Sequence, residues 1–468
     1  MYINLTATEK DHEIKRKIYQ RLLDWKKQQL GRTALLIEGA RRIGKSYVVE
    51  AFARQEYDDY LLVDFSAAQP EVHELFTHYA GNIDTLLSRL QLYYDKPLPV
   101  RPNPDAEAPA VIIFDEIQFC PKARAAIKHL VADRRFDYLE TGSLVSIKKN
   151  VKDILLPSEE ISVEMFPMDF EEFLWSQGNE ILMPFIAEQF RSHQPLGGLH
   201  RKAMDLFRQY LIVGGMPQAV DTFTRSGDFV KTDKQKRVIL GLYRNDISHY
   251  ADRQENNVTQ IFDALPEQLQ KHDKIFRLSS LKKEARMRDY ADAFFWLSDA
   301  RVINCCFNTT APNIGLRLNE NRSAVKCYMA DTGLLISHAF SERAIENDSL
   351  YKKLMFNTLS FNSGMLMENM VSQMLRASGH QLFFYAEPSR EADNRMEIDF
   401  LVAKPTVTSR HNISPIEVKS GKNYTLSSLR KCLTKYADHM ATPYVLHEQD
   451  LKSEDGILYL PLYMTPLL

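Results

Sequence analysis

The chain has 468 residues, of which 44% are hydrophobic, so it is long enough for about three or four domains with cores of their own. Its formal net charge of −2 excludes a global attraction to nucleic acid and leaves only a local basic patch as a DNA-binding surface. The five cysteines include an adjacent pair and no C-x-x-C motif, which argues against a disulfide framework and a zinc site. We find no signal peptide and no apolar run near the ~20 residues that span a bilayer. We therefore expect a cytoplasmic protein without a membrane partner.

Residues 31–165 alternate strand-like apolar runs with helical segments, which predicts a parallel α/β sheet. After the first run, Ala34–Ile37, the sequence Gly39–Ser46 matches the complete phosphate-loop pattern G-x-x-x-x-G-K-[ST]. The glycines let the backbone wrap a phosphate group, and the loop amides and the following helix N-terminus supply positive potential. We expect Lys45 to reach the β- and γ-phosphates and Ser46 to hold Mg²⁺.

A second apolar run, Ala110–Phe114, ends in the carboxylates of Asp115 and Glu116. Continuous apolar runs of this kind are typical of strands buried in parallel sheets. Asp115 is expected to hold Mg²⁺, directly or through water, and Glu116 to polarise an attacking water, as a hydrolase requires. A third run ends at Thr141 and Ser143, either of which could sense the γ-phosphate, although a plain turn is the alternative for both.

These motifs together predict a site for ATP and Mg²⁺, built at one edge of the first sheet. The residues expected to bind the nucleotide are Gly39, Ala40, Arg41, Arg42, Ile43, Gly44, Lys45, Ser46, Tyr47, Asp115 and Ser143.

The middle of the chain loses the strand pattern. Residues 166–250 are predicted to be helical, and residues 251–340 to form a compact unit of short helices. Within that unit, Leu278–Leu281 followed by Tyr290–Leu297 resembles the helix-turn-helix of a winged helix. The wing strands would be Val302–Asn304 and Lys326–Met329. The densest basic cluster, expected on the recognition helix, consists of Lys282, Lys283, Arg286 and Arg288. It indicates either contact with DNA or a solvated helix face.

The last 120 residues or so carry a second set of charged residues. A helix near residues 364–378 contains Glu368, and two later strand-like runs carry Asp399 on one and Glu417 with Lys419 on the other. Residues two apart on a strand face the same side, so Glu417 and Lys419 project together. If the two strands pair, we expect these side chains to converge on a sheet edge, with Glu368 added from the helix. Carboxylates at this spacing suit Mg²⁺, and the lysine would activate water or stabilise charge on a phosphodiester.

This arrangement, D-(x)n-E-x-K on a hairpin with an upstream helical glutamate, resembles the PD-(D/E)xK nuclease core. It implies Asp399, Glu417 and Lys419 as catalytic residues, and Glu368, Asp399 and Glu417 as metal ligands. The alternative is surface charge that alternates along a half-exposed strand. Nuclease-like folds are also often retained for binding only, so catalysis does not follow from the fold.

Over nearly its full length, the chain resembles the bacterial and archaeal P-loop ATPases of the AAA+ superfamily that have a C-terminal domain of unknown function with a restriction-endonuclease-like core. The motifs that carry the resemblance are Gly39–Ser46, Phe114–Gln118, Thr141–Ser143, Phe166–Phe173, Gly214–Pro217, Tyr243–Ile247, Ala330–Leu334 and Glu417–Lys419. The resemblance implies an α/β fold in four parts. These parts are an ATPase core at 1–165, a helical lid at 166–250, a winged-helix-like domain at 251–340 and a nuclease-like domain at 341–468.

One stretch departs from the family pattern. After Thr-Gly-Ser, members of the family usually continue to a Gly-Arg pair, whereas Leu155–Glu160 contains no arginine. If that arginine stabilises transition-state charge, its absence would slow hydrolysis. Arg134, Arg135 and Arg244 are candidate substitutes, and solvated surface arginines are the alternative. Slow turnover would suit a nucleotide-controlled switch better than a motor.

Two functions remain open at the level of the sequence. The first is an ATP-hydrolysing enzyme that acts on or near DNA, with a metal-dependent nuclease domain. The second is a nucleotide-regulated switch or interaction module whose nuclease-like domain binds a protein partner. A divalent ion among Glu368, Asp399, Glu417 and Lys419 would favour the first, and a salt bridge from Lys419 that fills the site would favour the second. The oligomeric state and the DNA substrate do not follow from the sequence.

Overall fold

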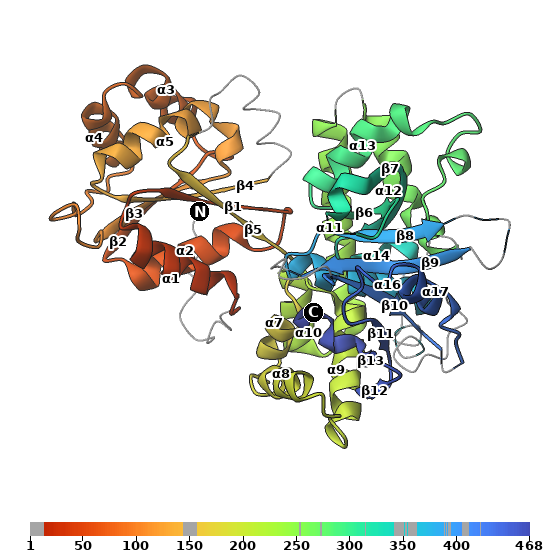
Figure 1. Cartoon of the computed structure of the whole chain (residues 1–468). Helices are drawn as coiled ribbons and strands as arrows, with labels where there is room; N and C mark the ends of the chain where they lie inside the picture. Colours follow the sequence, from red (N-terminus) through yellow and green to blue (C-terminus); the bar gives the residue numbers. More distant parts are fainter. Residues whose placement is uncertain are drawn as a thin grey trace.

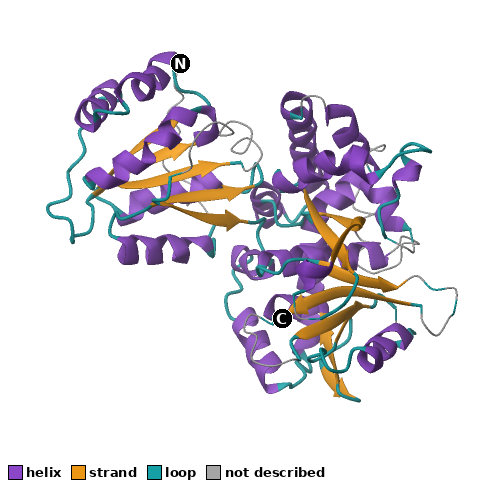
Figure 2. Ribbon diagram, turned by 45° about the horizontal axis from the view of Figure 1, so that its top comes forward, coloured by secondary structure: helices purple, strands orange, loops and turns teal. Residues whose placement is uncertain are grey.

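The computed structural model describes residues 14–143, 157–251, 254–271, 274–313, 315–340, 351, 353, 363–387, 389, 391, 395–404, 411–421 and 423–468. The chain is an α/β protein with a five-stranded parallel sheet, a helical region and a mixed eight-stranded sheet (Figure 1). Figure 2 shows the two sheets in different parts of the molecule, each with helices packed against it. Among the described helices, none is both long enough and apolar enough to cross a membrane.

The N-terminal sheet has the order β2-β3-β4-β1-β5, and all its neighbouring strands are parallel. Its strands are β1 (Ala34–Gly39), β2 (Asp59–Asp64), β3 (Ala110–Asp115), β4 (Asp137–Gly142) and β5 (Glu160–Met165). Its helices are α1 (Ile18–Gln29), α2 (Lys45–Glu56), α3 (Pro70–Tyr79), α4 (Ile83–Tyr93) and α5 (Pro121–Asp133), with a 3-10 turn at Ile117–Phe119. The strands predicted around the phosphate loop, Asp115 and Thr141 are thus confirmed.

Side-chain alternation along the strands explains why helices cover both faces of this sheet. Leu35 and Ile37 belong to the core under α1 and α2, whereas Leu36 belongs to the core under α3, α4 and α5 (Figure 1). Because all the strands are parallel, the carboxyl ends of β1, β3 and β4 meet at one edge. That edge carries the phosphate loop, Asp115 and Thr141.

The helical region begins at a capping box. The Asp169 side chain accepts from Glu172 N at 2.9 Å, and the Glu172 side chain accepts from Asp169 N at 3.1 Å. The helices are α7 (Phe170–Ser176), α8 (Leu182–Ser192), α9 (Leu199–Val213), α10 (Pro217–Ser226), α11 (Phe229–Tyr250), α12 (Glu255–Gln270) and α13 (Met287–Asp299), with a 3-10 turn at Leu278–Ser280.

The C-terminal sheet has the order β12-β13-β11-β10-β9-β8-β6-β7. Its strands are β6 (Ile303–Thr309), β7 (Glu320–Met329), β8 (Phe383–Glu387), β9 (Met396–Ala403), β10 (Ile413–Val418), β11 (Tyr444–His447), β12 (Lys452–Glu454) and β13 (Ile457–Pro461). The remaining elements are α14 (Thr332–Ala339), α16 (Ser363–Ala377), α17 (Ser427–Lys435) and 3-10 turns at Leu316–Asn319 and Leu462–Leu467. The predicted helices around Glu368 and after Ser427 are confirmed as α16 and α17.

The predicted wing strands pair as β6 and β7, but they do not form a separate unit. β6 also pairs in parallel with β8, so the hairpin extends the terminal sheet. The predicted division at residue 340 therefore crosses a continuous sheet, because β6 has hydrogen-bonded partners on both sides. The basic cluster lies mostly in the turn before α13, and only Arg288 is on that helix, which corrects its placement on a recognition helix.

Three chain segments meet in close backbone contact beside α9. Met168 N donates to Gly215 O at 2.6 Å, and Gly215 N donates to Asp331 Oδ2 at 2.6 Å. A Cβ atom at Gly215 would lie 2.1 Å from Met168 O, and one at Gly333 would lie 2.4 Å from Val213 O. Glycine is therefore required at both positions for these segments to approach one another.

We predict that Gly215→Ala lowers the free energy of unfolding by about 1–3 kcal/mol, because the added methyl group must push the backbone of Met168 away. Gly241→Ala is the matched control: Gly241 lies inside α11 with no atom within 4 Å of the added Cβ. That substitution should be neutral or stabilise the protein by up to about 1 kcal/mol through helix propensity. Thermal and urea unfolding would measure both effects. Equal stability of the two variants would contradict this account of the junction.

Candidate functional site

The phosphate loop is built around a buried lysine. Lys45 Nζ donates to Gly39 O at 3.2 Å and to Ala40 O at 3.0 Å, so it already faces the loop interior. Burial lowers the pKa of Lys45, whereas the nearby carboxylates of Glu116 and Asp115 act in the opposite direction. Gly44 has φ 88° at the N-cap of α2, a conformation that requires glycine.

Asp115 joins the loop to the neighbouring strand. Its Oδ1 accepts from Ser46 Oγ at 2.7 Å and also from Thr141 Oγ1. Glu116 N donates to the same Thr141 hydroxyl at 3.1 Å, and Gln118 donates to the Glu116 carboxylate. Burial raises the pKa of Asp115, and the two hydroxyl donors act against this rise. Ser46, Asp115 and Thr141 therefore form one polar group at the carboxyl edge of the sheet.

The structure does not bring Ser143 into this group. Ser143 lines a smaller cavity with Arg41, Tyr243 and Asp246, on the side of α11. Of the two hydroxyls at the end of β4, Thr141 is the one bonded to Asp115. The sequence left the choice open because both residues follow the same apolar run, and only the sheet register decides which side chain faces β3.

A cavity of about 890 Å³ opens beside the phosphate loop. It is lined by Arg41, Arg42, Gly44, Lys45, Ser46, Tyr47 and Glu116 from the core, and by Pro217, Gln218, Asp221, Arg225 and Leu242 from α10 and α11. Residues of the helical region therefore form part of its wall, so a molecule in the cavity would contact both parts of the chain.

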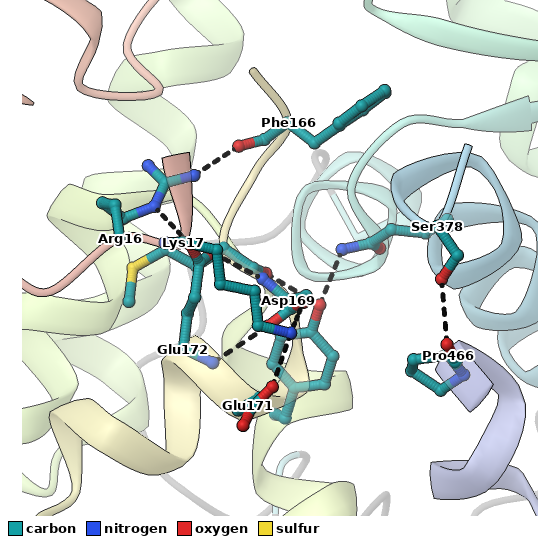
Figure 3. A network of polar contacts seen from close by, with 11 residues as sticks. Arg16, Lys17, Phe166, Asp169, Glu171, Glu172, Ser378 and Pro466 are labelled. Atoms are coloured by element: carbon teal, nitrogen blue, oxygen red, sulfur yellow. Dashed lines mark hydrogen bonds and ion pairs between the residues drawn. The ribbon is translucent and has the colours of Figure 1, made fainter. Parts of the chain in front are cut away.

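Arg16 is a structural residue of this site that the sequence did not reveal. Its buried guanidinium donates to Phe166 O at 2.6 Å and to Glu172 Oε1 at 3.1 Å (Figure 3). It also donates to Ile43 O at 2.7 Å. It thus ties the phosphate loop to the start of α7. The acidic Phe166–Phe173 motif could have signalled a need for a basic partner, but nothing in the sequence identified Arg16 as that partner.

The three arginines named as substitutes for a missing catalytic arginine are engaged elsewhere. Arg134 donates to Pro104 O at 2.8 Å, Arg135 pairs with Asp84 and Asp133, and Arg244 pairs with Asp263 at 2.7 Å. None of them lines the cavity beside the phosphate loop, whereas Arg41, Arg42, Arg54 and Arg225 do. Part of the arginine-free stretch, residues 155 and 156, lies outside the described residues.

The second candidate site lies between α16 and the central strands of the C-terminal sheet. β9 and β10 pair antiparallel up to Phe400 and Ile416, and the next residues in register are Asp399 and Glu417. Asp399 Oδ2 accepts from Val418 N at 2.8 Å. β9 and β10 are interior strands, so the expectation of a sheet edge was wrong: β8, β6 and β7 extend the sheet beyond them.

Lysines compensate the carboxylates of this cluster. Lys419 Nζ lies 2.5 Å from Glu417 Oε2, and Lys274 Nζ lies 2.5 Å from Glu368 Oε1. Lys326, on β7, is fully buried, with Nζ at 2.6 Å from a Glu397 oxygen and at 3.8 Å from Asp399 Oδ1. Sequence reasoning missed Lys274 and Lys326, because both come from a region assigned to another domain.

We call this group the terminal charge cluster; its members are Lys274, Lys326, Glu368, Glu397, Asp399, Glu417 and Lys419. Its side chains, as arranged in the structure, do not fit a divalent ion. Within the part of the chain that the structure describes, no group of three or more His, Cys, Asp or Glu side chains is arranged to hold a metal. Burial, followed by the nearby Asp399, raises the pKa of Glu417 to about 8, and burial likewise raises the pKa of Glu368. Each of Lys274, Lys326 and Lys419 lies within ion-pair distance of a carboxylate here.

Comparison with protein families separates the chain into matched regions. Residues 31–174 match the model described as "AAA domain". The chain carries an AAA-type ATPase domain. Two further models follow it: "Domain of unknown function (DUF8612)" at residues 204–344 and "Domain of unknown function (DUF4143)" at residues 363–464. The matched region 204–344 runs across the predicted division at residue 250. No curated protein matches the sequence.

Three solved structures show distant likeness to this AAA-domain protein. The "Thermotoga maritima RuvB Holliday junction branch migration motor" is 10% identical, covers 62% of this chain and 89% of its own, and has a TM-score of 0.28. "Drosophila ORC bound to DNA" is 10% identical, with 69% and 94% covered and a TM-score of 0.25. "Structural Basis for Katanin Self-Assembly" is 15% identical, with 36% and 57% covered and a TM-score of 0.21. The chain thus spans less than two thirds of the katanin chain, and none of these scores supports an argument.

We predict that Glu417→Gln flattens the pH dependence of stability between about pH 4.5 and 8. The folded pKa of Glu417, about 8, lies above its ordinary value of 4.5, so the folded state holds a proton that the unfolded chain has lost. The unfolding free energy therefore falls as pH rises through this window, and glutamine removes that contribution. Apparent Tm values at pH 5, 6, 7 and 8 measure the slope. The exposed Glu71→Gln serves as control, and identical slopes in both variants would refute the prediction.

Proposed function

We propose that the chain is a Mg²⁺-dependent ATPase whose nucleotide state controls its C-terminal half. The observation that carries this proposal is the composition of the cavity wall, in which the phosphate loop faces Pro217 and Leu242 of the helical region. A nucleotide bound by the AAA domain would contact both the phosphate loop and the helical region. Its binding and release are therefore expected to move the helical region relative to the AAA domain.

The roles of the core residues follow from their contacts. Lys45 exchanges the loop carbonyls for the β- and γ-phosphates, and burial makes that electrostatic attraction stronger than in water. Ser46 and Asp115 have hard oxygen donors within 2.7 Å of each other and fit Mg²⁺, which when bound neutralises phosphate charge. Glu116, oriented through Thr141 and Gln118, would take the proton of the attacking water.

For the terminal domain, we propose a nuclease-like core that holds a protein partner rather than cleaving DNA. Supporting this, Lys274, Lys326 and Lys419 each pair with a carboxylate of the terminal charge cluster. Lys326 is also packed 4.9 Å from the centre of the Phe384 ring, so it has little freedom to leave. We also propose that the regions divided at residues 165, 250 and 340 have separate functions. The eight-stranded sheet nevertheless continues across the division at residue 340.

The second candidate function is a metal-dependent nuclease that acts on DNA. It is favoured by the convergence of Asp399, Glu417 and Lys419 with Glu368, the four residues that the sequence motif named. A DNA-contacting surface for this function would be the exposed turn that holds Lys282, Lys283 and Arg286.

We predict that Lys45→Ala weakens ATP binding at least about tenfold, because it removes the charge that faces the phosphates. Glu116→Gln should leave binding intact and lower kcat by about 100-fold or more, since activation of the water is lost. Equilibrium binding of a fluorescent ATP analogue and steady-state phosphate release measure the two effects. The exposed Lys27→Ala should match the wild type in both. Normal turnover by the Glu116 variant would rule out the role given to this residue.

We predict that the full chain leaves supercoiled plasmid intact in Mg²⁺ and in Mn²⁺, because the buried Lys326 ammonium group lies beside the carboxylates of Glu397 and Asp399. Agarose electrophoresis after incubation at low salt measures nicking. Should the wild type nick the plasmid, and should Asp399→Ala and Lys419→Ala each abolish nicking while ATP turnover persists, the nuclease assignment would replace the binding assignment. Asp289→Ala, at an exposed carboxylate on α13, controls for surface charge.

A further inference from the structure

We propose that the Arg41 side chain is exchanged between Asp246 and the terminal phosphate of ATP, so that ATP, and not ADP, releases the C-terminal end of α11 from the phosphate loop. This inference rests on the proposed ATPase function and names the residue pair through which the nucleotide state reaches the rest of the chain.

Arg41 lies at the boundary between two cavities. It lines the large cavity with Lys45, Ser46 and Glu116, and it lines the smaller one with Asp246 and Tyr243. Its guanidinium forms an ion pair with Asp246 Oδ1, and Tyr243 OH donates to the Arg41 carbonyl at 3.3 Å. The side chain of Arg41 remains 36% exposed in spite of this pair, so it can turn from one cavity toward the other.

The surrounding charges make the pair responsive to a phosphate. Burial raises the pKa of Asp246, Arg41 lowers it, and the nearby Glu116 carboxylate raises it. The Asp246 carboxylate therefore depends on Arg41 for compensation. Arg41 also lies near enough to Lys45 to lower the pKa of that lysine. A γ-phosphate between Lys45 and Glu116 carries more negative charge than one carboxylate, and arginine can bind it with two parallel hydrogen bonds.

When Arg41 turns away, the Asp246 carboxylate loses its ion-pair partner while the nearby Glu116 carboxylate remains. Like charges at short range repel, so the end of α11 that carries Asp246 is expected to move away from the phosphate loop. ADP lacks the γ-phosphate and would leave the Arg41–Asp246 pair in place. This exchange would also bring an arginine of the phosphate loop itself to the transferred phosphate, in a chain whose Leu155–Glu160 stretch contains no arginine.

α11 is suited to transmit this change. Its 22 residues span about 33 Å, and its other end is fastened to the C-terminal half. Ser337 Oγ donates to Asp233 Oδ1 at 2.6 Å, and Arg237 donates to Phe340 O at 3.0 Å. Asp233 and Arg237 are on α11, and Ser337 is on α14, which follows β7 of the eight-stranded sheet. Movement of Asp246 would therefore displace α14, which is hydrogen-bonded to the other end of α11.

The test compares affinities for a fluorescent, slowly hydrolysed ATP analogue and for fluorescent ADP in Mg²⁺. Asp246→Asn frees Arg41 in advance, so it should tighten binding of the ATP analogue by roughly fivefold and leave ADP binding unchanged. Arg41→Ala should weaken binding of the ATP analogue by a similar factor, because the exchanged guanidinium is then missing. The matched control is Asp263→Asn, which breaks the ion pair between Asp263 on α12 and Arg244, two residues before Asp246 on α11 and outside both cavities.

An ATP-to-ADP affinity ratio in Asp246→Asn equal to that of the wild type and of Asp263→Asn would overturn the exchange. Binding of neither nucleotide by the wild type would overturn the proposed function as well, so the two failures are distinguishable.

Hydrogen exchange gives a second readout that needs no charge-removing variant. Amides at the C-terminal end of α11 should exchange faster with the ATP analogue than with ADP in the wild-type chain. Equal exchange in the two nucleotides would also overturn the proposal.

Discussion

The close backbone contact at Gly215 is the constraint on which the arrangement of the chain depends. There the link before α7, the link between α9 and α10, and the link between β7 and α14 come together through Met168, Gly215 and Asp331. Asp331 is fully buried, and burial raises the pKa of its carboxyl against the effect of the backbone donors Gly215 and Leu334. Because α10 starts at this point, the junction sets the wall of the cavity beside the phosphate loop.

Polar contacts continue from this junction into both halves of the chain. Toward the AAA domain, Arg16 ties Glu172 and Phe166 to the phosphate loop (Figure 3). Toward the C-terminal sheet, Tyr210 OH donates to Met168 O at 2.8 Å and accepts from Gln373 on α16 at 3.1 Å. The same helix carries Glu368 of the terminal charge cluster. The cavity beside the phosphate loop and this cluster are therefore connected by hydrogen bonds that run through α9 and α16.

The terminal charge cluster contains buried ion pairs, whose energetics differ from those of a metal site. Buried ion pairs contribute little net stability, because desolvation offsets most of the attraction, but removing one partner leaves a costly unpaired charge. Lys326 and Lys274 therefore act as internal cations among Glu368, Glu397 and Asp399. Removal of either lysine would leave a carboxylate without its ion-pair partner.

Local sequence patterns were sufficient to predict the parallel sheet, the phosphate loop, and the strands and helices around Glu368, Asp399 and Glu417. Each of these features is encoded by residues that lie close together in the sequence. The contacts between distant segments were decided only by the tertiary structure. Periodicity says nothing of which buried lysine reaches a given carboxylate, so Lys326 and Arg16 could not be placed. Strand pairing across domains likewise depends on long-range register, which is why β6 and β7 were assigned to a separate unit. The sequence by itself determined the chemistry available at each site, and the fold decided which groups meet and compensate one another.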